Sequence, residues 1–336
     1  MSEKLLEIKN ERLSFFTPAG EVKALNDVSF SMDQGDVLGI VGESGSGKSV
    51  TAYSIMGLTA DPGRVVGGEI HFNGHRIDQL KEKELRKIRG NEVSIIFQDP
   101  MTSLNPVYTI GNQICEVLLL HTKCTKQQAR EKAIELLTLV GINEPERRMK
   151  QYPHEFSGGM RQRIMIAIAL ACEPKLLIAD EPTTALDVTI QAQILELMVS
   201  LKKKIGMSII MITHDLGIVS SICEKIAVMY AGKIVEYGTI DDIFYHTAHE
   251  YTKGLLNSIP KLTEKEHEKL VPIEGSPVDM LNPPAGCPFA PRCKSCMKVC
   301  LEKMPEYTHL SDTHYSACWL LQKKELEKQQ EDTQIG

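Results

Sequence analysis

A glycine-rich segment at residues 42–49, with the sequence GESGSGKS, restricts the fold of this chain more than any other feature. It follows an apolar run at residues 37–41, which is typical of a buried strand, and precedes residues 50–56, which are typical of the first turns of a helix. Glycines let the backbone curl so that successive N–H groups point inward, and the following helix adds the positive end of its dipole. The segment therefore predicts a phosphate-binding loop, in preference to a glycine turn without chemical meaning.

Two side chains at the end of this loop suit a bound nucleotide. Lys48 can bridge the outer phosphates, and the hydroxyl of Ser49 can ligate Mg²⁺. The nucleotide contacts expected from this segment come from Gly42, Ser44, Gly45, Ser46, Gly47, Lys48, Ser49 and Val50.

Length and charge set broad limits. With 336 residues, the chain exceeds one ordinary core and suggests a domain of typical size with an appendage. Its formal net charge of −6 offers no basic face, so we expect no nucleic-acid partner. No apolar run reaches the roughly 18 residues that a membrane helix requires, and residues 1–10 are charged, unlike a signal peptide. We therefore expect a cytoplasmic protein that reaches a membrane only through a partner.

The first hundred residues have the pattern of β-structure. Short β-type runs alternate with turns over residues 5–41 and predict an antiparallel sheet that leads into the phosphate-loop strand. Phe15 and Phe16 precede the loop at a distance suited to stacking on a base, although on spacing alone a core aromatic is the simpler interpretation. A second buried strand at residues 93–97 ends in Gln98, at the edge where ligands of α/β proteins bind.

Residues 107–172 are helical in character, and we interpret them as an inserted helical subdomain. Near their end Ser157 is a suitable N-cap, and Gly158 and Gly159 leave the first amides of the next helix uncovered. Such a helix start can accept an anion, although an ordinary capped helix has the same sequence.

Two further apolar runs end in residues with catalytic chemistry. Residues 176–179 lead into Asp180, which can hold Mg²⁺ through water, and Glu181, which can take a proton from an attacking water. A surface acidic pair is the alternative, but such a pair does not normally follow four consecutive apolar residues. Residues 209–213 end in His214, whose imidazole can hydrogen-bond a γ-phosphate or serve as a cap.

In this order, the segments resemble those of an ATP-binding cassette ATPase, the motor subunit of ABC transporters, over residues 5–255. The motifs that carry the resemblance are Walker A at residues 42–49, the Q-loop at Gln98, the signature motif at residues 156–160, Walker B at residues 176–181, the D-loop at residues 185–187, which include Asp187, and the switch histidine at His214.

The resemblance implies an α/β fold of the P-loop NTPase type. We expect a RecA-like mixed sheet, an antiparallel β subdomain and the helical subdomain, inserted at about residues 100–172, within an ATPase domain at residues 1–255. The implied catalytic residues are Glu181, His214 and Lys48, and the implied Mg²⁺ ligands are Ser49, Gln98 and Asp180.

The resemblance also implies that two such subunits clamp ATP head to tail. The residues that would then act on the partner's nucleotide are Ser157, Gly158, Gly159 and Asp187. Phe156, Met160 and Val50 depart from the general cassette pattern, but the backbone contacts survive these changes.

Three longer phrases are similar to the ATP-binding subunits of oligopeptide and dipeptide permeases, a family that includes nickel importers. They are FQDPMTSLNP at residues 97–106, YPHEFSGGMRQR at 152–163 and GCPF at 286–289. This similarity favours Phe15 over Phe16 as the base-stacking residue. It implies a motor for uptake of oligopeptides or dipeptides, placed at the cytoplasmic face of the membrane. The implied partners are a second ATPase subunit, two transmembrane permease subunits and an extracellular or periplasmic peptide-binding protein.

Two other functions stay open at this point. One is the import of nickel or a metal chelate. The other, less favoured, is a soluble cassette protein that acts on ribosomes or DNA, which usually has two fused cassettes or large coiled-coil insertions. This chain has one cassette and a net negative charge.

Five of the nine cysteines are crowded near the end of the chain, with the spacing C-x5-C-x2-C-x3-C-x17-C. In a reducing compartment, such a group suggests iron–sulfur or zinc binding more than disulfides, and a metal-free group of thiols is the alternative. The resembling family implies a [4Fe-4S] cluster on Cys287, Cys293, Cys300 and Cys318, with Cys296 as an extra thiol. We expect a C-terminal extension at residues 256–322 and a polar, frayed tail at residues 323–336.

Overall fold

The computed structural model describes residues 4–183, 186–259 and 272–323. Within these ranges the larger of two sheets runs in the order β11 (Thr308–His309), β12 (Tyr315–Ser316), β10 (Lys233–Thr239), β9 (Lys225–Tyr230), β3 (Val37–Val41), β8 (Ser208–Thr213), β7 (Leu176–Asp180) and β6 (Val93–Ile96). The smaller sheet has the order β2 (Gly20–Asp33), β1 (Lys4–Thr17), β4 (Gly63–Phe72) and β5 (His75–Arg76).

The centre of the larger sheet is parallel. Strand β3 pairs in parallel with β8 and β9, and β7 pairs in parallel with β6 and β8. Because parallel strands end at the same edge of a sheet, the segments after β3, β6, β7 and β8 meet there. These four strands correspond to the predicted strands at residues 37–41, 93–97, 176–179 and 209–213. Motifs that are far apart in the sequence therefore meet at one site.

The smaller sheet is antiparallel, as the sequence predicts. The alternation in residues 5–16 suggests two short runs, whereas the structure has one long strand, β1, in which the register shifts on both sides of Glu11. Such irregularities let one strand bend without ending, and no turn residue is needed for them.

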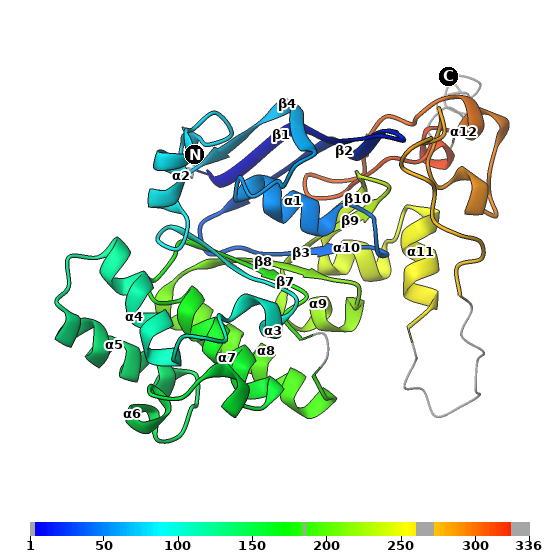
Figure 1. Ribbon diagram of the computed structural model, residues 1–336. Helices are drawn as coiled ribbons and strands as arrows, with labels where there is room; N and C mark the ends of the chain where they lie inside the picture. Colours follow the sequence, from blue (N-terminus) through cyan, green and yellow to red (C-terminus); the bar gives the residue numbers. More distant parts are fainter. Residues whose placement is uncertain (1–3, 184–185, 260–271, 324–336) are drawn as a thin grey trace, which may run out of the picture.

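Helix α1 (Lys48–Ile55) lies between the two sheets, and α7 (Gly158–Ala169), α8 (Val188–Ile205) and α9 (Leu216–Ile222) cover the other face of the larger sheet (Figure 1). Strand β3 shows why two layers form: Leu38 and Ile40 join the core beneath the smaller sheet, while Val37 and Val41 join the core of the helical side. This is the two-residue period of a strand that is buried on both faces.

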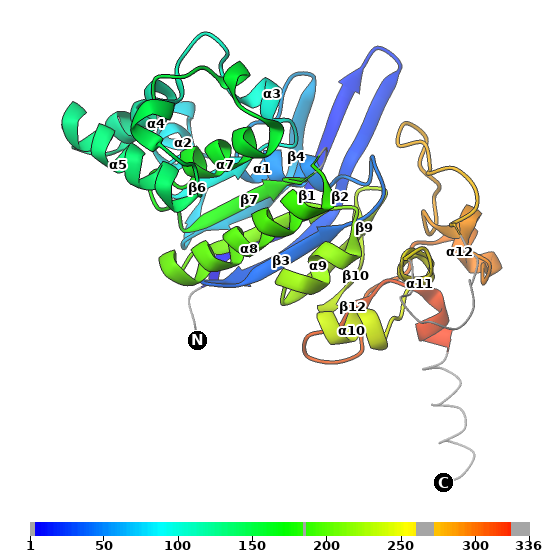
Figure 2. The same ribbon diagram turned by 90° about the horizontal axis from the view of Figure 1, so that it is seen from below.

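The helical subdomain projects from one end of the molecule and the C-terminal extension from the other (Figures 1 and 2). Thr109 and Thr125 cap the two longest helices of the subdomain by accepting hydrogen bonds from Asn112 N and Gln128 N. The subdomain helices are α3 (Pro100–Ser103), α4 (Ile110–His121), α5 (Lys126–Leu139) and α6 (Pro145–Arg148). The other helices are α2 (Glu82–Ile88), η1 (Pro153–Glu155), α10 (Ile240–Tyr245), α11 (Glu250–Asn257), η2 (Ala290–Arg292) and α12 (Lys298–Glu302).

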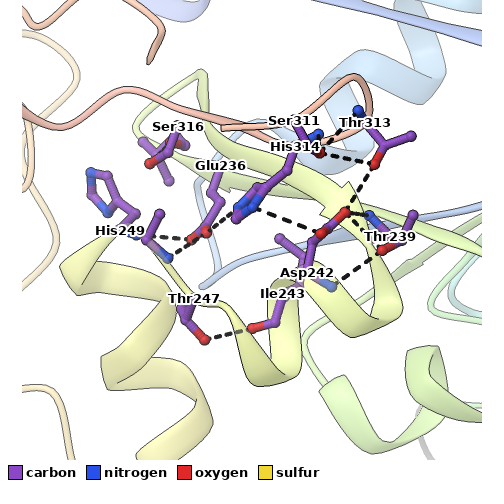
Figure 3. Close-up of polar contacts among 12 residues, drawn as sticks. Glu236, Thr239, Asp242, Ile243, Thr247, His249, Ser311, Thr313, His314 and Ser316 are labelled. Carbon is purple, nitrogen blue, oxygen red and sulfur yellow. Dashed lines mark hydrogen bonds and ion pairs between the residues drawn. The ribbon is translucent and has the colours of Figure 1, made fainter. Parts of the chain in front are cut away.

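The C-terminal extension is joined to the ATPase domain through the larger sheet. Strand β12 pairs with β10, and next to it the buried carboxylate of Glu236 accepts hydrogen bonds from His314 Nε2 at 2.9 Å, Ala248 N at 2.7 Å and His249 N at 3.1 Å (Figure 3). The sequence suggests an appended unit at residues 256–322, whereas its two short strands extend the sheet of the preceding domain. The tail predicted at residues 323–336 lies outside the described residues except for Lys323.

Candidate nucleotide-binding site

Glycines give the phosphate loop its shape. Gly42 has φ 156° and Gly47 has φ 102°, conformations that other residues rarely adopt. A Cβ atom on Gly42 would collide with the carbonyl oxygen of Met229, and one on Gly47 would lie 2.9 Å from the carbonyl oxygen of Ala24. Gly47 is also the N-cap of α1, so the helix begins directly after the loop, as the sequence predicts.

Lys48 is buried against the loop that it follows. Its Nζ donates hydrogen bonds to the carbonyl oxygens of Gly42 at 2.7 Å and Glu43 at 2.9 Å. Burial lowers the pKa of Lys48, and the nearby carboxylates of Glu181 and Asp180 oppose that shift. An ammonium group enclosed in this way gains from anionic phosphate oxygens, which would replace neutral carbonyls as its partners.

Ser49 and Asp180 form the part of the site that suits a divalent cation. Ser49 Oγ donates to Asp180 Oδ1 at 2.9 Å, while Asp180 Oδ2 is buried and has no hydrogen-bond partner of standard geometry. Burial raises the pKa of Asp180, although the hydrogen bond from Ser49 opposes the shift. A hydroxyl and a buried carboxylate with a spare oxygen are ligands that Mg²⁺ prefers, so these residues fit the predicted ion.

Glu181 lies between two side chains from neighbouring strand ends. Gln98 Nε2 donates to Glu181 Oε2 at 2.9 Å, and His214 Nδ1 lies 3.2 Å from Glu181 Oε1. The backbone of Glu181 has φ 45°, which is uncommon for a residue other than glycine and stores strain of about 1–3 kcal/mol. The structure thus brings together Lys48, Ser49, Gln98, Asp180, Glu181 and His214.

The other predicted residues of the signature motif and D-loop lie at the starts of α7 and α8, and residue 185 of the D-loop lies outside the described residues. Ser157 caps α7 by accepting from Met160 N, and Asp187 caps α8 by accepting from Ile190 N. A Cβ on Gly159 would lie 2.8 Å from Ile190 Cγ2, and one on Gly158 would lie 3.9 Å from Leu186 Cδ2. These four residues therefore form one surface of adjacent helix starts.

The two candidate base-stacking residues differ in environment. Phe15 is partly buried and packs on the core of the smaller sheet, close to Gly63 of the paired strand β4, while Phe16 is 46% exposed. Val50, on the first turn of α1, is half-buried. Base stacking on Phe15 stays a prediction.

Sequence reasoning missed the partners of Glu43, the second residue of the loop. Its N–H donates to the hydroxyl of Tyr251 at 2.9 Å, and its carboxylate forms a two-point ion pair with Arg292. Tyr251 lies on α11 and Arg292 ends η2, so both contacts come from the last third of the chain. No local pattern could reveal them, because Glu43 and Arg292 are 249 residues apart.

The predicted cluster cysteines lie in the C-terminal extension. Cys287, Cys300 and Cys318 are buried and Cys293 is partly buried, whereas Cys296 is exposed. Burial, aided by the nearby Cys300, Cys318 and Cys293, raises the pKa of Cys287 to about 12. Over residues 4–183, 186–259 and 272–323, no group of three or more His, Cys, Asp or Glu side chains has a metal-binding arrangement. The thiols share a neighbourhood, and the iron–sulfur cluster stays a prediction.

Two family models match the sequence. The model described as ABC transporter matches residues 25–184, which include the phosphate loop and the Asp180 strand. The model described as the C-terminal region of oligopeptide/dipeptide transporters matches residues 235–300.

Curated relatives match over nearly the whole chain. The oligopeptide transport ATP-binding protein OppD of Bacillus subtilis (strain 168) is 57% identical over 319 residues, or 95% of this chain and 89% of that protein. The dipeptide transport ATP-binding protein DppD of the same organism is 54% identical over 319 residues, which are 95% of this chain and 95% of that protein. OppD of Escherichia coli (strain K12) is 54% identical over 304 residues, 90% of each protein.

Solved structures of similar shape are ATP-binding cassettes. The dimeric structure of the cassette MJ0796 in a post-hydrolysis state, bound to ADP and Pi, has a TM-score of 0.64 at 27% identity and covers 70% of this chain and 98% of that chain. CbiO1 of Clostridium perfringens, part of the ABC transporter complex cbiONQ, has a TM-score of 0.61 at 27% identity and covers 73% and 92%. Within the described ranges, no helix has both the length and the apolar character that a membrane span requires.

Proposed function

The chain belongs to the family of ATP-binding subunits of oligopeptide and dipeptide ABC transporters, and we propose that it powers peptide uptake across the cytoplasmic membrane. It is an ATPase of the ATP-binding cassette fold. The observation that carries its proposed mechanism is the position of Glu181 between Gln98 and His214, beside the phosphate loop.

In the proposed reaction, Glu181 takes a proton from water as the water oxygen bonds to the γ-phosphorus, and the bond to the β–γ bridging oxygen breaks to release ADP and phosphate. Lys48 donates to the outer phosphates, and His214 hydrogen-bonds the γ-phosphate as charge develops. Mg²⁺ supplies charge neutralisation when it is bound. Ser49, Asp180 and Gln98 are the residues proposed to hold it.

Replacement of the base tests this assignment. We expect Glu181→Gln to bind ATP about as tightly as the unmodified chain and to lose at least about 100-fold in hydrolysis, because a general base contributes about 10²- to 10⁴-fold. Phosphate release and equilibrium ATP binding are the two measurements. Glu135→Gln, on the exposed surface of α5, is the matched control, and normal hydrolysis by Glu181→Gln would show that another group is the base.

The surface at the starts of α7 and α8 suits contact with a nucleotide on another subunit. We propose that Ser157, Gly158, Gly159 and Asp187 contact the nucleotide bound by a second ATPase subunit, which is either a sister chain or another copy. Exposed backbone amides at the start of a helix suit a phosphate anion. The similar cassette MJ0796 was solved as a dimer. A disulfide cross-link between Ser157→Cys and Ser44→Cys of the opposing subunit, formed only with ATP, would support this arrangement; cross-linking that ignores ATP would argue against it.

The permease subunits would bind at the helical subdomain. A groove of about 1250 Å³ runs along α4 and α5 and includes Ser103 and Asn105 of the loop after Gln98. The residues that line it include Tyr108, which is 53% exposed, and Leu120, which is 73% exposed. We propose that a cytoplasmic helix of the permease docks in this groove and thereby places the chain on the cytoplasmic face of the membrane.

The cargo is proposed to be oligopeptides or dipeptides, delivered by an external peptide-binding protein. The named relatives are peptide transport proteins, and this favours peptides over nickel or a metal chelate. ATP hydrolysis by the assembled importer should rise with peptide-loaded binding protein. Stimulation by a nickel-loaded binding protein instead would reverse the assignment.

For the C-terminal extension, we propose a [4Fe-4S] cluster on Cys287, Cys293, Cys300 and Cys318. The burial of three of these thiols and the exposure of Cys296 support this choice of ligands. Cys287 N donates to the carbonyl oxygen of Cys300 at 2.8 Å, which ties the first and third segments together. When bound, the cluster would link four segments that contribute few apolar residues. Anaerobic purification followed by an absorption spectrum and iron and zinc analysis tests this proposal, and the absence of both metals would reject it.

A further inference from the structure

We propose that Arg292, in the cysteine-rich extension, is a positioning residue for nucleotide binding: it holds Glu43 of the phosphate loop and neutralises the negative charge that Glu43 places beside the triphosphate. Nothing in the phosphate-loop motif requires this contact. It joins two parts of the chain that the sequence treats as separate domains.

The geometry of the pair is specific. Arg292 Nη1 and Nη2 donate to Glu43 Oε2 at 2.5 Å and Oε1 at 3.0 Å, which is the two-point geometry of a strong arginine–carboxylate pair. The Arg292 side chain is only 4% exposed, and it also donates to the carbonyl oxygens of Ile273 and Glu274. A guanidinium held by this many partners cannot move away without loss of several bonds.

Glu43 is close enough to the nucleotide site for its charge to matter. Its carbonyl oxygen accepts from Lys48 Nζ at 2.9 Å, and its charge raises the pKa of Lys48 against the effect of burial. Without Arg292, a carboxylate would lie next to the place where three phosphates must bind. Like charges this close repel each other, and the positive charge of Arg292 offsets that repulsion.

Aromatic rings pack beside Arg292, whose guanidinium carbon lies 5.9 Å from the centroid of the Tyr230 ring. Phe289, in the same loop between Cys287 and Cys293, packs against Tyr230 and Tyr251, with ring centroids 5.4 and 5.3 Å apart. The hydroxyl of Tyr251, which is uncharged, accepts a hydrogen bond from the N–H of Glu43. Both the backbone and the carboxylate of Glu43 are therefore held from the C-terminal part of the chain.

A double-mutant cycle in the full-length chain tests the proposal through equilibrium binding of ATP and ADP. We expect Arg292→Met, which keeps most of the side-chain length, to weaken ATP binding about tenfold, or about 1.4 kcal/mol, and to weaken ADP binding less because ADP carries less negative charge. Adding Glu43→Gln to Arg292→Met should restore ATP binding to within about twofold, since it removes the unpaired carboxylate.

Lys294→Met is the matched control. It removes one positive charge two residues from Arg292. The Lys294 side chain is 72% exposed, and its Nζ lies 3.7 Å from Glu274 Oε1, so the substitution should leave ATP binding unchanged. A double variant as weak as Arg292→Met would overturn the proposal, because loss of packing would then explain the defect. Equal ATP affinity of Arg292→Met and the unmodified chain would overturn it too.

If Arg292→Met does not fold, as judged by thermal unfolding, two milder variants decide. Glu43→Gln alone should bind ATP at least as tightly as the unmodified chain, because it removes a negative charge from the loop and leaves the positive charge of Arg292 uncompensated. Arg292→Lys keeps the charge but not the two-point geometry and should show a smaller loss than tenfold. ATP binding weakened more than fivefold in Glu43→Gln would contradict the proposal.

Discussion

Glu11 shows how strongly one residue can depend on its surroundings. Its side chain is fully buried where the register of β1 shifts; Oε1 accepts from Ser54 Oγ at 2.6 Å, and Oε2 is buried without a hydrogen-bond partner. Burial raises the pKa of Glu11 from 4.5 to about 6. A carboxylate in this position is a cost to the folded state, since its charged form loses water without full compensation.

A pH dependence follows from that shift. Because the pKa is higher in the folded state, the folded state binds more protons between pH 4.5 and 6, and stability falls as pH rises through this window. The full effect is at most about 2 kcal/mol, because one pKa unit is worth about 1.36 kcal/mol. Urea unfolding of the unmodified chain and of Glu11→Gln should show that the variant gains relative stability as pH rises from 4.5 to 7.5. Glu21→Gln, exposed on β2, is the control, and a difference that does not change with pH would contradict the assignment.

Among single residues, the sequence predicts that the polar side chains directly after the parallel strands lie close together. Gln98, Glu181 and His214 each follow an apolar run of strand length, and the parallel order of β6, β7 and β8 brings them into contact. The partners of Glu43 could not be predicted, because an ion pair across 249 residues leaves no periodic signal. The orphaned oxygen of Glu11 is equally invisible, since an irregular register depends on the strands beside it.

At the scale of elements, the short strand β12 attaches the extension to the ATPase domain. His314, directly before β12, donates from Nε2 to the carboxylate of Glu236 on β10 at 2.9 Å, and both side chains are buried. Glu236 also accepts the N–H groups of Ala248 and His249, so one carboxylate links β10, the start of α11 and the extension (Figure 3). Two-residue strands have no hydrophobic period, and this is why the sequence suggests a boundary at residue 255 instead.

Removal of His314 should loosen this attachment. His314→Ala leaves a buried carboxylate without one of its partners, and we expect a loss of about 2–3 kcal/mol in unfolding free energy. Hydrogen exchange should rise in residues 287–323 more than in the phosphate loop. His309→Ala, an exposed histidine on β11, serves as the control, and equal exchange in the two variants would show that the Glu236 contact does not attach the extension.

At the scale of the whole molecule, the site lies between the two projecting parts, the helical subdomain and the C-terminal extension (Figures 1 and 2). The sequence predicts both parts, from helical spacing over residues 107–172 and from the change in composition after residue 255. It does not predict that the extension touches the phosphate loop. That contact depends on α11 and η2 meeting Glu43, and neither short helix has a pattern that specifies its neighbours.

The proposed permease contact can be tested by comparing two exposed leucines at opposite ends of the molecule. Leu120, on α4, is 73% exposed at the groove, and Leu301, on α12 of the extension, is 57% exposed. An exposed leucine without a partner contributes little to folding, so neither Leu120→Glu nor Leu301→Glu should change ATP binding. A charge introduced into an apolar contact must be desolvated when a partner binds. We therefore expect only Leu120→Glu to lose co-purification with the permease subunits and peptide uptake. If Leu120→Glu assembles and transports normally, or if Leu301→Glu is the variant that fails, the docking helix does not bind in the groove of α4 and α5.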